Sequence, residues 1–251
     1  MASQTATDVE HISLMDAFEQ EWLKLPTAVM RESGPAAQTF AGLLRITNKE
    51  TFSAVASIAA RARLPAKTVR NQLDVLANHG WIVNAGRERT KRGGPRRTCT
   101  IRLTKKATDS LDLYGVLPWW ACCNSSLKVK GKELGHLPWC AKAVLSIVTG
   151  RLMSLRKVAI NQGKEYELWD AVEELGGEDK FRFSLDHLEY VTGLSRPSIV
   201  NAKNELARRR ICYWAPDKAE TGGNLTDMLG PLRDFHAVCR NAEKGRCYLE
   251  F

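Results

Sequence analysis

Residues 54–83 read AVASIAARARLPAKTVRNQLDVLANHGWIV, and this stretch decides the fold that we expect. Apolar residues recur at helical spacing on both sides of a break at Leu64–Pro65. The spacing predicts one helix over 54–63 and a second helix over 65–78, because proline suits the first turn of a helix. Gly80 then supplies the residue that ends the second helix.

The residues that follow predict two strands joined by a basic loop. Trp81–Val83 has the composition of a strand, and Thr98–Leu103 (TCTIRL) alternates like a strand that returns beside it. Between them lies a segment rich in glycine and arginine, and we call its central part, Arg87–Arg97 (RERTKRGGPRR), the basic loop. Helix, turn, helix, strand, loop and strand is the order of a winged helix-turn-helix.

The same pattern returns about 130 residues later. Phe181–Phe183 predicts a short strand, a helix runs through Thr192, and Gly193–Leu194 forms the turn. Ser195 is a good N-cap for a second helix that extends to about Arg209. A strand over 211–214 completes the pattern.

The two copies also share residues at a constant offset of 130. The identical pairs are Leu64/Leu194, Asn71/Asn201, Leu76/Leu206 and Ala77/Ala207. Leu–Pro pairs precede the copies at 25–26, 117–118 and 137–138. We therefore expect a mainly α fold with small β-wings (α+β), built of two winged helix-turn-helix domains in tandem. The expected boundaries are a disordered tail at 1–12, a first domain at 13–107, a connector at 108–132 and a second domain at 133–251.

Upstream of residue 50, periodicity predicts two more helices. Leu14, Phe18, Trp22 and Leu25 recur at helical spacing, which predicts a short amphipathic helix that runs to Pro26. A further helix is expected from about Pro35 to Ile46, with Phe40, Leu43 and Leu44 facing inward.

The formal charge of +9 is concentrated in one segment. Between Gly86 and Lys106 lie nine basic residues and one acid, Glu88, so the rest of the chain is close to neutral. A concentrated basic patch indicates a polyanion that binds at one place. The alternative is a solvated charged loop, although such loops usually mix the two signs.

The candidate DNA contacts of the first unit lie on its second helix and on the basic loop. Arginine and asparagine can read guanine and adenine by paired hydrogen bonds, and loop arginines can bind phosphates or enter a minor groove. The candidates are Lys67, Thr68, Arg70, Asn71, Arg87, Arg89, Lys91, Arg92, Arg96 and Arg97. Two short helices of an α-bundle give the same helical pattern, but the attached strand and arginine-rich loop count against that alternative.

The second unit offers fewer candidates, which we expect to be exposed: Arg196, Ser198, Asn201 and Lys203. The stretch Glu165–Asp179 just before them carries seven acids and no base. Such a stretch weakens the case for DNA binding by this half, and contact with a partner or a second copy of the chain is the alternative.

Nothing in the sequence points to catalysis or to a cofactor. The phosphate-binding G-x-x-x-x-G-K-[ST], the His-x-His pair and the G-x-S-x-G elbow are all missing, so we do not expect an enzyme. Cys212, His236, Cys239 and Cys247 could supply four zinc ligands, but without a CxxC pair ordinary buried thiols are favoured and no metal is expected. Without a long apolar run or a leader, we expect a cytoplasmic chain associated with the nucleoid or a plasmid, and no membrane contact.

The run Trp22–Pro26 (WLKLP), followed by Ala36–Ile46 and the Val55–Ile82 unit, resembles the opening of plasmid-type replication initiator proteins. Tandem winged helices also resemble the iteron-binding initiators, and this resemblance implies that one domain binds repeated duplex DNA while the other helps the chain to form a homodimer. The motifs are short and are shared with transcription regulators of the MarR and GntR kinds. The long segment Asp217–Arg246 departs from a compact wing.

Three functions therefore stay open. The first is a replication initiator, or an associated regulator of a plasmid or mobile element, that recognises specific double-stranded DNA. The second is a transcription regulator whose second domain dimerises or senses a ligand. The third is a protein-interaction module in which the basic loop is incidental.

Overall fold

A computed structural model describes residues 22–46, 50–84, 98–109, 113–122, 128–129, 132–133, 136–162, 181–209, 211–216, 226–231 and 248–249. Over these residues the chain is mainly helical, with small sheets whose strands pair mostly antiparallel. The fold is therefore α+β in character, as the sequence predicts.

The first unit, residues 36–103, joins three helices to a three-stranded sheet. Its elements are α3 (Ala36–Leu44), β2 (Glu50–Ala54), α4 (Val55–Ala62), α5 (Ala66–Asn78), β3 (Ile82–Asn84) and β4 (Thr98–Leu103). Strand β4 lies between β2 and β3 and is antiparallel to both. The helices α4 and α5 and the strand β4 fall where periodicity places them.

The second unit, residues 139–231, repeats this order of elements. It comprises α8 (Trp139–Asn161), β8 (Arg182–Ser184), α10 (Leu185–Thr192), α11 (Arg196–Arg208), β9 (Cys212–Pro216) and β10 (Thr226–Pro231). Strand β10 lies between β8 and β9, which matches the position of β4 in the first sheet. Helices α10 and α11 begin and end 130 residues after α4 and α5. The repeat that the sequence predicts is therefore present in the elements themselves.

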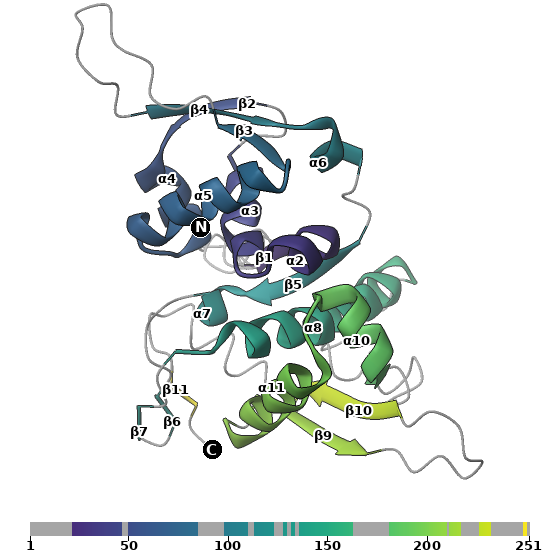
Figure 1. The fold of residues 1–251 in the computed structure, drawn as a ribbon. Helices are drawn as coiled ribbons and strands as arrows, with labels where there is room; N and C mark the ends of the chain where they lie inside the picture. Colours follow the sequence, from purple (N-terminus) through teal and green to yellow (C-terminus); the bar gives the residue numbers. More distant parts are fainter. Residues whose placement is uncertain are drawn as a thin grey trace, which may run out of the picture.

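A two-stranded ribbon lies between the units (Figure 1). Strands β1 (Trp22–Pro26) and β5 (Tyr114–Pro118) both end in Leu-Pro and pair antiparallel. Lys24 lies opposite Val116 at the centre, and on either side of this pair Leu23 lies opposite Leu117 and Leu25 lies opposite Gly115. A short helix follows each strand, α2 (Thr27–Ser33) after β1 and α7 (Trp119–Cys122) after β5.

Four further short elements complete the described chain. They are α6 (Lys105–Asp109), β6 (Lys128–Val129), β7 (Lys132–Glu133) and β11 (Tyr248–Leu249). Strand β6 pairs antiparallel with β7 and parallel with β11.

One continuous hydrophobic core joins the two units through the ribbon. Leu23 and Leu25 of β1 and Leu117 of β5 are fully buried. Helix α8 packs on β5, where the Thr149 hydroxyl donates to the carbonyl of Val116. Because a Cβ at Gly115 would overlap the side chain of Ser146, glycine allows this helix to approach the strand closely.

The core of the first unit fixes the helix pair α4–α5. Phe40 of α3 packs edge to face on Trp81, with 6.1 Å between ring centroids. A Cβ at Gly42 would lie 2.7 Å from Cβ of Ala62, so glycine is needed where α3 crosses the end of α4. The ammonium of Lys106 lies 4.3 Å from the centroid of the Trp81 ring and closes this core from outside.

Several predicted boundaries are corrected by the structure. The helix expected to run to Pro26 is wrong at its end, because residues 22–26 form β1, and residues 13–21 lie outside the described part of the chain. Helix α2 was not predicted, and the helix expected over 35–46 is α3, with Leu44 only partly buried. The expected connector, 108–132, contains β5 and α7, and the expected tail at 1–12 lies outside the described residues.

Candidate nucleic-acid interface

The first helix pair presents a polar face to solvent. On α5, Val69, Leu73 and Leu76 are buried against the core. Lys67, Arg70 and Asn71 are exposed on the opposite side, while Thr68 is partly buried. The structure therefore brings these four candidates together on one helix, at and after its N-terminal turn. Such a face offers both cationic donors and a carboxamide, which suits contact with phosphates and base edges.

The C-terminal end of α4 adds two arginines, Arg61 and Arg63, that the sequence analysis did not select. Arg63 caps α4 in the left-handed region, with φ 52°, where glycine is the usual residue. Burial lowers the pKa of Arg45 from its usual value, and the charges of Arg61 and then Arg63 lower it further. The positive charges of Arg61 and Arg63 thus act on Arg45 at the end of α3. In the sequence, the two arginines separated by one residue at 61 and 63 could have indicated this basic site.

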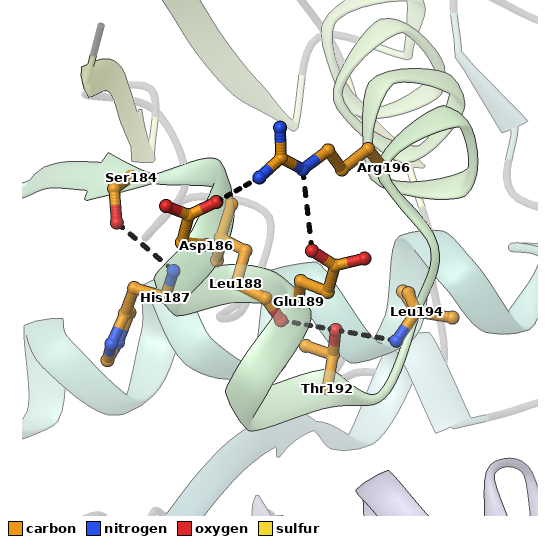
Figure 2. Close-up of polar contacts among 8 residues, drawn as sticks. All are labelled: Ser184, Asp186, His187, Leu188, Glu189, Thr192, Leu194 and Arg196. Carbon is orange, nitrogen blue, oxygen red and sulfur yellow. Dashed lines mark hydrogen bonds and ion pairs between the residues drawn. The ribbon is translucent and has the colours of Figure 1, made fainter. Parts of the chain in front are cut away.

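The second helix pair begins with a side-chain cap. The Ser184 hydroxyl accepts a hydrogen bond of 3.1 Å from the backbone N–H of His187, as expected for an N-cap (Figure 2). Helix α10 ends at Gly193, whose φ of 68° permits the sharp turn into α11. Phe183 stacks on His187, and burial, followed by the charge of Arg151, lowers the pKa of that imidazole.

The polar face of α11 differs from that of α5. Arg196 and Asn201 are exposed as predicted, whereas Ser198 is partly buried, with its hydroxyl 3.0 Å from that of Ser195. Lys203 corrects our expectation, since only 3% of it is exposed. It lies four residues after Ile199 and three before Leu206, so helical geometry places it on the buried side. Lys203 is therefore not a candidate for contact with a ligand at the surface.

The two helix pairs differ in charge. From α4 through α5 the bases are Arg61, Arg63, Lys67 and Arg70, and the single acid is Asp74. From α10 through α11 the bases are Arg196, Lys203 and Arg208, and the acids are Asp186, Glu189 and Glu205. The first pair therefore carries a net charge of +3 and the second is neutral. Attraction for a polyanion is expected mainly at the first pair.

Contacts with α2 fix the turn between α10 and α11. The guanidinium of Arg31 in α2 lies 5.0 Å from the ring centroid of Tyr190. A Cβ at Gly193 would lie 2.5 Å from the carbonyl oxygen of Arg31. Because backbone meets backbone here, the position of the second helix pair depends directly on α2.

A buried polar network also links the units. The Gln38 amide donates to the carbonyls of Ala62, at 2.8 Å, and Cys122, at 3.0 Å. Lys142, which is buried, donates to the same Cys122 carbonyl at 3.3 Å. Ala62 is the last residue of α4, so this network reaches the turn of the first helix pair.

The basic loop lies outside the described residues, and so do its candidates: Arg87, Arg89, Lys91, Arg92, Arg96 and Arg97. The strands on either side of it are described. Ile82 pairs with Leu103, and Asn84 pairs with Ile101, so β3 and β4 run antiparallel as far as Asn84, the last residue described before the loop. The described residues before and after the basic loop therefore belong to the sheet of the first unit.

The described residues contain no group of three or more histidine, cysteine or acidic side chains that could hold a metal ion. Of the four possible zinc ligands, only Cys212 is described; it is buried, and burial raises the pKa of its thiol. Among the described helices none has the length and apolar character needed to cross a membrane.

Comparison with known proteins adds no relatives. No protein-family model matches the chain, and neither a curated protein nor a solved structure matches it. Function must therefore be argued from the geometry and charge of the two helix pairs.

Proposed function

We propose that this chain is a sequence-specific double-stranded DNA-binding protein built of two winged helix-turn-helix units in tandem. One observation carries the proposal: both units have the same order of helices and strands, the same order of strands in the sheet, and a 13-residue second helix with a polar outer face. In a helix-turn-helix protein this second helix lies in the major groove, which is wide enough to admit it.

The first unit supplies most of the attraction for DNA. Its helix pair has an excess of three positive charges, and the basic loop adds arginines at the end of the β3–β4 hairpin. In this arrangement Arg70 and Asn71 face base edges, while Lys67 and the loop arginines contact phosphates. The neutral second pair adds specificity more than affinity.

The β1–β5 ribbon supports an inverted arrangement of the two half-sites. Its register is symmetric about Lys24 and Val116, so the chain leaves the two strands in opposite directions. The exposed Asn71 and Asn201 hold equivalent positions on α5 and α11. We expect a bound site with two unequal half-sites in inverted order, each with an adenine read by one of these asparagines.

Initiation of replication on a plasmid or mobile element is the biological role that we propose, with transcription regulation as the second candidate. The second candidate is favoured by the neutral charge of the α10–α11 pair, which would suit dimerisation or ligand sensing by that half. Footprints on the DNA that encodes the protein separate the two roles. An initiator protects direct repeats of the whole site near an origin, whereas a regulator protects a promoter palindrome.

Binding of the intact protein to a fluorescent random duplex, measured over a range of salt concentrations, tests DNA binding. Counterion release predicts a linear fall of log affinity with log salt, with a slope of about −0.9 per phosphate contacted. Selection from a random duplex library then tests specificity. A protein-interaction module would give neither a steep slope nor an enriched sequence.

Replacing Asn71 with alanine is expected to relax the base preference at one position of the selected site. Loss of a good bidentate contact with a base costs about 1–3 kcal/mol at that position only. The measurement is binding of Asn71→Ala to a panel of single-base variants of the site. Asn78→Ala, an exposed substitution at the far end of α5, should leave the preference unchanged. Equal weakening of Asn71→Ala on every duplex would instead assign Asn71 to the phosphates.

A further inference from the structure

Two carboxylates of α10 hold an arginine at the start of α11 (Figure 2). Nη2 of Arg196 donates to Oδ1 of Asp186, and its Nε lies 3.4 Å from Oε2 of Glu189. Asp186 and Glu189 are three residues apart, so they share one face of α10 and both reach the first residue of the next helix. The guanidinium is thus gripped along the edge that carries Nε and Nη2.

These two contacts leave the edge of the guanidinium that carries Nη1 and Nη2 available for a further ligand. Arginine has five N–H donors in a fixed planar fork. The contacts with the two carboxylates use Nε and one hydrogen of Nη2, and the edge formed by Nη1 and Nη2 still presents one parallel donor from each nitrogen. In the major groove, guanine presents two acceptors, O6 and N7, at the spacing that such a fork matches.

Stability alone does not account for the arrangement. The side chains of Arg196, Asp186 and Glu189 are 60%, 61% and 45% exposed, and exposed ion pairs add little to folding. Asp186 also lies in the first turn of α10, where the helix dipole favours an acid, but the dipole gives Glu189 no reason to point to the same arginine.

Comparison of the two units points the same way. The positions equivalent to Asp186, Glu189 and Arg196 in the first unit are Ala56, Ala59 and Ala66. Acids at a DNA interface repel phosphates and lower affinity for every sequence alike. Asp186 and Glu189 beside the exposed start of α11 therefore lower the affinity for non-specific DNA. They are useful only if they fix the orientation of a cation that reads a base.

We propose that Arg196 reads a guanine in the second half-site, and that Asp186 and Glu189 are positioning residues that aim its guanidinium. The proposal rests on the proposed DNA-binding function and names the base and the residues that discriminate in the second unit. The two acids lower the affinity for DNA in general and raise the specificity. They orient the guanidinium of Arg196 before binding, and their negative charge disfavours contact with phosphates of any sequence.

The test is selection from a random duplex library by the intact chain and three variants, with binding to one random duplex measured alongside. Arg196→Ala is expected to lower the guanine preference at one position about tenfold or more. The double variant Asp186→Asn/Glu189→Gln should lower the preference at that same position while raising affinity for the random duplex, because it removes two negative charges. Arg208→Ala removes an equal charge from the far end of α11 and should keep the full preference.

Two results would overturn the proposal. The first is an Arg196→Ala variant that retains every base preference of the wild type. The second is a double variant that retains the guanine preference, which would leave the carboxylates with no role in reading. Both results leave DNA binding by the wild type in place, whereas a wild-type chain that enriches no sequence overturns the proposed function itself. Thermal unfolding of each variant confirms that the exposed substitutions leave the fold intact.

Discussion

Replacing Arg92, Arg96 and Arg97 with alanine is expected to lower affinity for a random duplex about a hundredfold at physiological salt. The basic loop has a net charge of +5, more than half of the net charge of +9 of the chain, and each phosphate that it neutralises releases counterions. Loss of three such contacts should make the slope of log affinity against log salt shallower by about 2–3 units. Anisotropy titrations of the intact protein at several salt concentrations measure both quantities.

A charge-matched variant separates charge from side-chain shape. Arg92→Lys/Arg96→Lys/Arg97→Lys keeps three cations, so it should keep the wild-type slope even if lysine fits a minor groove less well. An alanine triple with an unchanged slope would show that the basic loop does not contact phosphates. The excess charge of the first helix pair would then carry the non-specific affinity.

The helix pairs could be predicted from sequence because their signals are local. Apolar spacing, the proline after Leu64 and the left-handed Gly193 define α4, α5, α10 and α11 within one or two residues. The β1–β5 ribbon could not be predicted in this way. Its strands lie about 90 residues apart in the sequence. The apolar residues up to Leu25 have helical spacing, and only pairing with β5 supplies hydrogen-bond partners for the extended backbone of WLKLP.

The candidate site was predicted in part, for a related reason. Exposed residues of α5 follow directly from the helical pattern, and the same pattern should have placed Lys203 on the buried side. The partners of Arg196 come from the preceding helix, at a separation of seven and ten residues, and depend on the angle of the turn. Helical periodicity contains no information on that angle, so the sequence predicts an exposed Arg196 but not its contacts with Asp186 and Glu189.

Gly193→Ala is expected to destabilise the protein by about 2–5 kcal/mol, more than any of the surface substitutions proposed above. Alanine at φ 68° strains the backbone, and its Cβ would lie 2.5 Å from the carbonyl oxygen of Arg31 and 2.7 Å from the Arg31 Cα. Both neighbouring atoms belong to the backbone of α2, so no side-chain rotation relieves the overlap. Equilibrium unfolding in urea measures the change in free energy.

The variant Gly80→Ala measures the backbone strain of a positive φ without any steric overlap of the new Cβ. Gly80 has a φ of 71°, but no atom lies within 4 Å of the position that its Cβ would take, so we expect a loss of about 1–2 kcal/mol. Arg63, which is equivalent to Gly193, already shows that the first turn accepts a side chain at φ 52°. The difference between the two glycine variants therefore measures the contact between α2 and the second turn. Equal losses would show that this contact does not constrain the second helix pair, and that the β1–β5 ribbon and the Gln38 network couple the two units without it.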